Sequence, residues 1–105
     1  MKQRLATCPD MKLSIIDFTA AWCGPCRQLR PVLETLSREY GIPLVEVDTD
    51  HDPLTAQQFN VRSMPTVVLM RDGREVGRFV GARPRAFVAG MLDRALAGDS
   101  AIASP

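Results

Sequence analysis

The sequence contains the stretch DFTAAWCGPC, Asp17 to Cys26, which connects a predicted strand to a predicted helix. The strand is the apolar, β-branched run at 13–18, whose composition is typical of a strand buried on both faces of a sheet. The helix follows from about Cys23 to Tyr40, where apolar residues recur along one stripe. Two cysteines three positions apart therefore stand at the start of a long helix, directly after a buried strand.

Outward from this stretch, strand and helix signals alternate along the chain. The expected elements are a strand at 43–48, a short helix at 52–60, strands at 66–70 and 76–80, and a final helix at 84–98. The Asp-Gly pair at 72–73 predicts an antiparallel hairpin, and the helix between the first two strands predicts that they run parallel with a right-handed crossover. The pattern indicates one α/β domain at 1–98, followed by a flexible tail at 99–105.

The composition fits a single globular domain and excludes several classes of function. With 105 residues, of which 46% are hydrophobic and 24% charged, the chain can build one core of its own. A net charge of +1 and dispersed basic residues argue against nucleic-acid binding. No apolar run approaches a membrane span, and residues 1–10 lack the apolar stretch of a signal peptide. We therefore expect a cytoplasmic protein with no membrane association, in a compartment that keeps thiols reduced.

The cysteine pair has the spacing and the position that disulfide exchange needs. Residues at i and i+3 of a helix share a face, so Cys23 and Cys26 are close enough to form a disulfide. The free N–H groups and the dipole of a helix N-terminus favour the thiolate, which is the nucleophile. Cys23 lies at the exposed N-terminal end and should attack a substrate disulfide. Cys26, one turn further in, should resolve the mixed disulfide.

A CxxC pair also occurs in zinc sites and in structural disulfides, and both remain as alternatives. Cys8 and His51 would complete a set of four zinc ligands, but neither has the paired spacing usual in such sites. The total of three cysteines is odd, which argues against a purely structural disulfide framework. We interpret Cys8 as a free thiol and the pair as redox-active, with no metal.

Taken together, these motifs resemble those of the thioredoxin family. DFTAAWCGPC is similar to the family's active-site signature, and Pro31 lies where thioredoxins carry a helix-kinking proline. VRSMPT at 61–66 is similar to the segment that holds the cis-proline, and the motifs at 72–73 and 80–82 match the later hairpin turn and the glycine beside the active site. The resemblance covers about Leu13 to Leu96. It implies a thioredoxin fold, with a mixed sheet of four or five strands flanked by about three helices.

The resemblance gives Asp17 the role of proton acceptor and donor for Cys26. A carboxylate inside an apolar strand loses hydration, which raises its pKa and independently favours such a role. The alternative is a side chain that points to solvent at the end of the strand. The resemblance also implies a cis peptide bond between Met64 and Pro65, whose loop would pair with an extended substrate segment. As an alternative, Met64 could simply fill the core.

A small, flat apolar surface around the cysteines is the expected recognition site for extended protein segments. Its expected members are Trp22, Gly24, Pro25, Met64, Pro65, Thr66, Gly81 and Ala82. Trp22 alone could be a core aromatic, but its place beside Cys23 favours the surface.

The chain departs from the family pattern at two places. Only about twelve residues precede the first predicted strand, where thioredoxins carry an additional strand and helix, so we expect this unit to be reduced or missing. Residues 2–7 could add a short edge strand, but one face of the sheet would be less covered, which would lower stability or leave room for a partner or a second copy. Glu46 stands where many bacterial thioredoxins have a lysine near the buried carboxylate.

These residues predict a protein-disulfide reductase that works by reversible dithiol–disulfide exchange at Cys23 and Cys26, with no bound cofactor. The resemblance implies protein disulfides as substrates and thioredoxin reductase, an NADPH-dependent flavoprotein, as electron donor. The Gly-Pro between the cysteines is similar to that of reducing members rather than of oxidants or isomerases. We expect a monomer. The alternative is a non-catalytic thioredoxin-fold subunit that binds within a larger complex.

Overall fold

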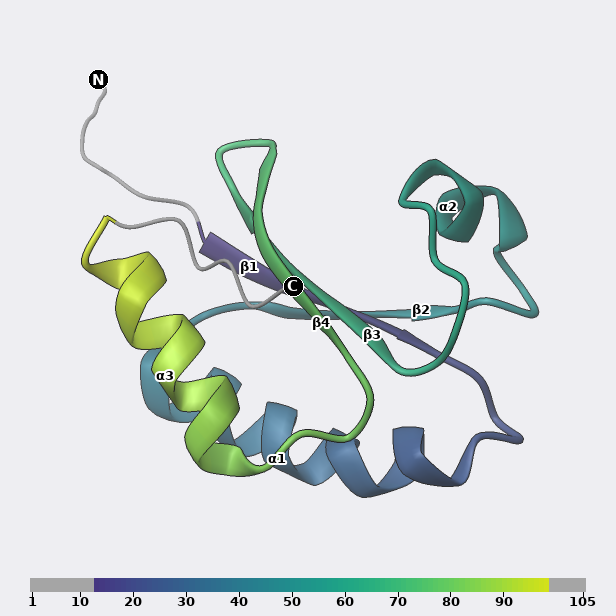
Figure 1. Ribbon diagram of the computed structural model, residues 1–105, viewed down its shortest axis with the longest axis horizontal. Coiled ribbons are helices and arrows are strands. Elements are labelled where there is room, and N and C mark those ends of the chain that lie inside the picture. The colour runs from purple at the N-terminus through teal and green to yellow at the C-terminus, as the bar shows by residue number, and fades with distance from the viewer. Residues whose placement is uncertain (1–12, 99–105) are drawn as a thin grey trace.

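The computed structural model describes residues 13–98. In chain order the elements are β1 (Leu13–Thr19), α1 (Gly24–Tyr40), β2 (Leu44–Asp48), α2 (Pro53–Gln58), β3 (Thr66–Arg71), β4 (Arg74–Val80) and α3 (Arg85–Leu96). This order of strands and helices is the one predicted from the sequence (Figure 1). The predictions for Cys8, for an edge strand at 2–7 and for a tail at 99–105 lie outside the described residues.

The four strands form one mixed sheet in the order β2-β1-β3-β4, which confirms the predicted fold class. β1 and β2 are parallel and are connected through α1, whereas β3 is antiparallel to both β1 and β4. The turn at 72–73 closes the hairpin with both of its residues at positive φ. β4 begins at Arg74, earlier than predicted, and a bulge between Leu69 and Met70 separates its first pairs from the rest of the ladder.

The helices divide unequally between the two faces of the sheet. α1 and α3 lie together on one face, and α2 lies on the other (Figure 1). The main core lies between the sheet and the α1–α3 layer, where the buried residues include Ile15, Leu33 and Leu92. The α2 side has a smaller cluster built on Phe18 and Val68. Within 13–98, none of the helices is long and apolar enough to cross a membrane.

The two ends of α1 are set by residues suited to those positions. Cys23 is the N-cap, and its sulfur accepts a hydrogen bond from the backbone N–H of Cys26 at 3.2 Å. Pro25 occupies the first turn, where its missing N–H has no partner to lose. Gly41 ends the helix at φ 66, and its N–H caps the carbonyl of Ser37. This geometry fixes the redox pair at the N-terminus of a 17-residue helix.

Candidate functional site

The two cysteines form a disulfide in the first turn of α1. Their Cα atoms lie 5.3 Å apart, within the range that a disulfide spans without distortion of the backbone. Both residues are nearly buried, with 4% exposure for Cys23 and 1% for Cys26. Cys23 is therefore less exposed than we expected, because Ala20 and Met64 pack against the pair. It remains the more exposed of the two residues.

The helix N-terminus supplies the electrostatics that a nucleophilic thiolate needs. No acidic side chain lies in the first turn of α1, so the positive end of its dipole is not opposed there. The hydrogen bond from Cys26 N to Cys23 Sγ already places one N–H donor against the sulfur. Arg27 donates to the carbonyl of Ala21 at 2.7 Å and holds the loop that leads into the helix. The helix dipole and the N–H of Cys26 both favour negative charge on Cys23 after reduction.

A cis peptide bond between Met64 and Pro65 faces the disulfide, as the resemblance implied. The carbonyl of Pro65 accepts a hydrogen bond from Gly81 N at 2.9 Å, so the two loops beside the cysteines are joined. Met64 is half-buried and packs against the cysteine cluster, while Ala82 is exposed at the rim. Met64 therefore does more than fill the core, because part of it remains accessible beside the disulfide.

Thr66 is the exception among the predicted surface residues. Its side chain is 1% exposed, and its hydroxyl donates to the carbonyl of Ser63 at 2.6 Å. Pro65 is also buried, so its ring shapes the loop but is not part of the exposed surface beside the disulfide. The Thr66 side chain is therefore not part of the exposed surface, and the place of this residue in substrate binding stays a prediction. The hydroxyl instead braces the turn that carries the cis peptide bond.

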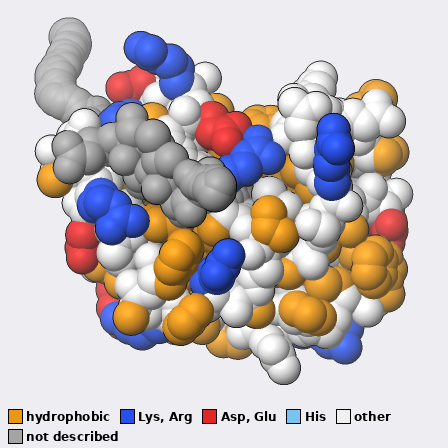
Figure 2. Space-filling model, in the orientation of Figure 1, with side chains coloured by type: hydrophobic (Ala, Val, Ile, Leu, Met, Phe, Trp, Pro, Cys, Tyr) orange, Lys and Arg blue, Asp and Glu red, His pale blue; other side chains and the backbone are white. Residues whose placement is uncertain are grey.

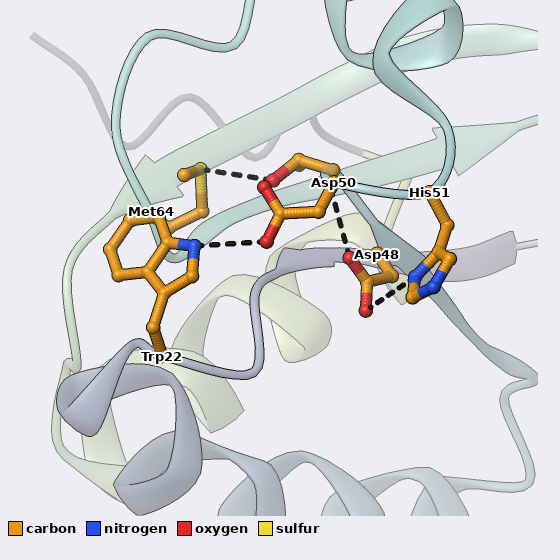
Figure 3. Close-up of polar contacts among 6 residues, drawn as sticks. Trp22, Asp48, Asp50, His51 and Met64 are labelled. Carbon is orange, nitrogen blue, oxygen red and sulfur yellow. Dashed lines mark hydrogen bonds and ion pairs between the residues drawn. The ribbon is translucent and has the colours of Figure 1, made fainter.

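Trp22 stands at the surface beside the disulfide. It is 65% exposed, which rules out the alternative of a core aromatic. Its indole N–H donates to Asp50 Oδ2 at 3.0 Å, and this bond fixes the ring beside the active-site loop (Figure 3). Gly24 and Pro25 follow at the start of α1, where Gly24 is half-buried and Pro25 is exposed. In Figure 2, hydrophobic side chains gather over the lower half of the face shown, with charged side chains scattered among them.

Asp50 belongs to a loop after β2 that sequence reasoning did not assign to the site. Its backbone N–H donates to Asp48 Oδ1 at 2.9 Å, and Asp48 in turn pairs with His51 Nδ1 at 3.1 Å (Figure 3). The hydrogen bond from His51 holds the pKa of Asp48 below its usual value. From the same loop, the Thr49 hydroxyl donates to the Met64 sulfur at 3.8 Å. One short loop thus contacts both Trp22 and Met64.

The zinc alternative finds no support among the residues described. His51 pairs with Asp48 and lies with neither cysteine, and no group of three or more His, Cys, Asp or Glu side chains within 13–98 could hold a metal ion.

The sequence did contain a signal for Asp50. Three aspartates lie at or just after the end of β2, the strand that runs parallel to β1. Parallel neighbours end at the same edge of a sheet, so that loop had to lie near Trp22.

Asp17 lies in the interior of the protein. It is 1% exposed, and among residues 13–98 neither of its carboxylate oxygens has a hydrogen-bond partner. Burial is the main cause that raises the pKa of Asp17 to about 6; the charge of Glu46 raises it further, and that of Arg30 lowers it. The alternative of a solvent-facing Asp17 is therefore wrong. The predicted site thus combines a redox pair, a buried acid and an apolar rim.

Comparisons with known proteins point to one family. The sequence model of the thioredoxin family matches residues 2–94, so the match begins ahead of β1. A thioredoxin 1 from Synechococcus elongatus is 40% identical over 84 residues, 78% of each chain. The thioredoxin of Chlamydia trachomatis is 47% identical over 74 residues, which cover 70% of this chain and 72% of that protein.

Solved structures agree. Fasciola hepatica thioredoxin superimposes with a TM-score of 0.75 at 38% identity, covering 79% of this chain and 80% of that one. The oxidised mitochondrial thioredoxin 3 of Saccharomyces cerevisiae gives a TM-score of 0.71 at 40% identity, with 78% of both chains covered.

Proposed function

Because this chain belongs to the thioredoxin family, we propose that Cys23 attacks substrate disulfides, Cys26 resolves the mixed disulfide and Asp17 handles the proton of Cys26. The protein is a protein-disulfide reductase that works by reversible thiol–disulfide exchange. One observation carries the assignment of roles: the disulfide lies at a helix N-terminus with Cys23 as the N-cap and Cys26 one turn inside.

The proposed reaction starts from the reduced pair. The Cys23 thiolate attacks one sulfur of the substrate disulfide, the substrate S–S bond breaks, and the second substrate sulfur leaves as a thiolate that takes up a proton. Asp17 then accepts the proton of Cys26. The Cys26 thiolate attacks Cys23 Sγ, the bond between Cys23 and the substrate breaks, and the first substrate sulfur leaves as a thiolate that takes up a proton. The substrate has gained two electrons, and the Cys23–Cys26 disulfide has formed.

The pKa of Asp17 suits this role at neutral pH. At a pKa of about 6 the carboxylate is mostly ionised near pH 7, so it can accept a proton, yet its proton affinity is far higher than that of an exposed aspartate. Its unpartnered oxygens leave room for a proton without the loss of a hydrogen bond.

We propose that clients bind as extended segments across the apolar rim. Trp22 and Met64 flank the disulfide, and the backbone of the cis-proline loop would pair with the client chain. Gly24, Gly81 and Ala82 carry small side chains or none, which allows close approach. Main-chain recognition of this kind fits many protein disulfides with little side-chain specificity.

The oxidised pair needs an electron donor to act again. We propose an NADPH-dependent flavoprotein, thioredoxin reductase, in the cytoplasm, with this protein acting as a monomer. The support is the family itself and the Gly-Pro between the cysteines. The test of the donor is NADPH oxidation in the presence of insulin and a bacterial thioredoxin reductase.

Cysteine variants test the proposed roles. In the insulin reduction assay with dithiothreitol, Cys23→Ser should lose all activity above the uncatalysed rate, because no attacking thiolate remains. Cys26→Ser should also be inactive. When the reduced variant is freed of dithiothreitol and then mixed with insulin, it should accumulate a mixed disulfide that is visible on a non-reducing gel, because resolution is blocked. Cys8→Ser is the matched control and should keep wild-type activity. A mixed disulfide trapped by Cys23→Ser instead of Cys26→Ser would reverse the two roles.

A further inference from the structure

An ion pair connects the redox helix to the strand beside Asp17. Arg30 Nε, on α1, lies 3.0 Å from Glu46 Oε2, on β2. Arg30 follows Cys26 by four positions, so it lies one turn further along the same helix face. The two side chains are 43% and 38% exposed, yet the Nε atom of Arg30 is itself fully enclosed and makes no hydrogen bond.

The register of the sheet places this pair beside the buried carboxylate. Glu46 is the β2 residue directly opposite Asp17 on β1, and laterally paired residues of a sheet project to the same face. The Arg30 contact shows that this is the face covered by α1. On the other side of Asp17, β3 contributes Val67, which carries no charge. Within 13–98, the resolved charges that act on Asp17 are therefore Glu46 and Arg30.

We propose that Arg30 and Glu46 are positioning residues that set the proton affinity of Asp17 through opposed charges. This inference rests on the proposed role of Asp17 as the proton acceptor for Cys26. Neither residue touches the reacting sulfurs. Their effect reaches the reaction only through Asp17, whose oxygens have no hydrogen bond that would otherwise govern the proton.

The geometry predicts effects of opposite sign from the two members of the pair. A negative charge beside a carboxylate favours its protonated form, and a positive charge favours its ionised form. Glu46 alone would raise the pKa of Asp17 and so reduce the fraction of carboxylate that can accept a proton at neutral pH. Arg30 offsets that charge. The ion pair thus keeps Asp17 available as a base although a second carboxylate lies on the next strand.

A titration of Asp17 in the oxidised full-length protein tests the inference without any activity measurement. Cys23 and Cys26 do not titrate as a disulfide, so the carboxyl carbon shift of Asp17 against pH follows one group. Relative to wild type, the pKa of Asp17 should rise in Arg30→Met and fall in Glu46→Gln. Each change should be on the order of threefold in the proton-binding constant, as expected for single charges that are themselves partly exposed to solvent. The double variant should lie between the two single variants.

The ion pair between Arg85 and Glu39 provides matched controls. This pair joins α1 to α3, and its side chains are 51% and 49% exposed, similar to those of Arg30 and Glu46. Arg85→Met and Glu39→Gln remove the same charges and should leave the Asp17 titration as in wild type. Shifts of the same sign in Arg30→Met and Glu46→Gln, no shift in either, or equal shifts in the controls would overturn the proposal.

A second measurement separates this proposal from the role of Asp17 itself. The rate of insulin reduction is followed against pH for wild type, Asp17→Asn and the two pair variants. If Asp17→Asn leaves the pH profile unchanged, the proposed proton transfer fails, and the titration alone still decides the influence of the ion pair. If Asp17→Asn removes a limb of the profile, that limb should move to higher pH in Arg30→Met and to lower pH in Glu46→Gln. A limb that stays in place in both variants would contradict the proposal.

Discussion

Asp17 is unusual among the residues of β1 because it carries a charge into the interior. It is buried, its oxygens have no partners, and its pKa is raised to about 6 by burial first and by Glu46 second. An unpartnered buried carboxylate lowers stability whenever it is ionised. The burial of Asp17 is thus a cost to the fold, and its proposed role in the reaction would account for that cost.

The pH dependence of stability gives a test of this burial. An unfolded aspartate releases its proton near pH 3.8, whereas folded Asp17 holds it up to about pH 6. Between these values unfolding releases a proton, so stability falls as pH rises and levels off above the folded pKa. The full difference corresponds to about 3 kcal/mol. Asp17→Asn, which never ionises, should therefore match wild type near pH 3.5 and be more stable by about 2 to 3 kcal/mol at pH 8.

Urea unfolding of the oxidised proteins at several pH values measures this difference. Parallel curves for wild type and Asp17→Asn across the whole range would contradict the burial of an ionisable Asp17. A difference in stability that grows toward acid pH would mean that folding lowers the pKa of Asp17, as it does for a carboxylate that the fold stabilises in its ionised form.

At the residue scale, the sequence predicted groups whose chemistry is visible in a motif. Cys23, Cys26 and Asp17 lie within one continuous stretch, so their spacing could be interpreted directly. Asp50 was not predicted, because its bond to Trp22 joins positions 28 residues apart. The burial of the Thr66 side chain was not predicted, because a motif shows which residues surround a site but not which side chains point inward.

α1 is the element that the sequence predicted best. Its start and end carry local signals, with Pro25 in the first turn and Gly41 in the left-handed conformation at the end. The start of β4 was less predictable, because the bulge at Leu69/Met70 depends on pairing between strands and has no mark in the local sequence.

Two Gly→Ala substitutions test how α1 and α3 use their glycines. At Gly41 and Gly90 an added Cβ would meet no atom closer than 3.8 Å, so crowding decides neither case. Gly41 has φ +66, where alanine is strained, and Gly41→Ala should lower the free energy of unfolding by about 1 kcal/mol. Gly90 lies inside α3 and has no positive φ, so Gly90→Ala should raise the free energy of unfolding by about 0.5 to 1 kcal/mol.

Thermal unfolding of the two variants compares one chemical change in two backbone conformations. A loss of stability in both would mean that Gly90 has a packing role. A gain in both would mean that the C-terminus of α1 does not need its left-handed residue.

At the scale of the whole molecule, the sheet has a strong face and a weak face. The α1–α3 side holds the large cluster of buried residues, and the α2 side has only three within 13–98. The order of elements was predictable from local patterns, since helix and strand periods are clear. The central place of β1, between β2 and β3, was not predicted, because no local signal states which strands become neighbours.

Adjacent valines in β3 offer a matched test of this asymmetry. Val67 and Val68 are both 0% exposed, but neighbours in a strand point to opposite faces, so Val67 packs in the large cluster and Val68 in the small one. The same two methyl groups are lost in Val67→Ala and in Val68→Ala. In Val67→Ala the cavity should persist in the dense α1–α3 layer, and the free energy of unfolding should fall by about 2 to 3 kcal/mol. In Val68→Ala the cavity should partly collapse, and the fall should be about 1 kcal/mol smaller. Urea unfolding at a single pH measures both values, and an equal or larger loss at Val68 would show that the α2 face is packed as tightly as the other.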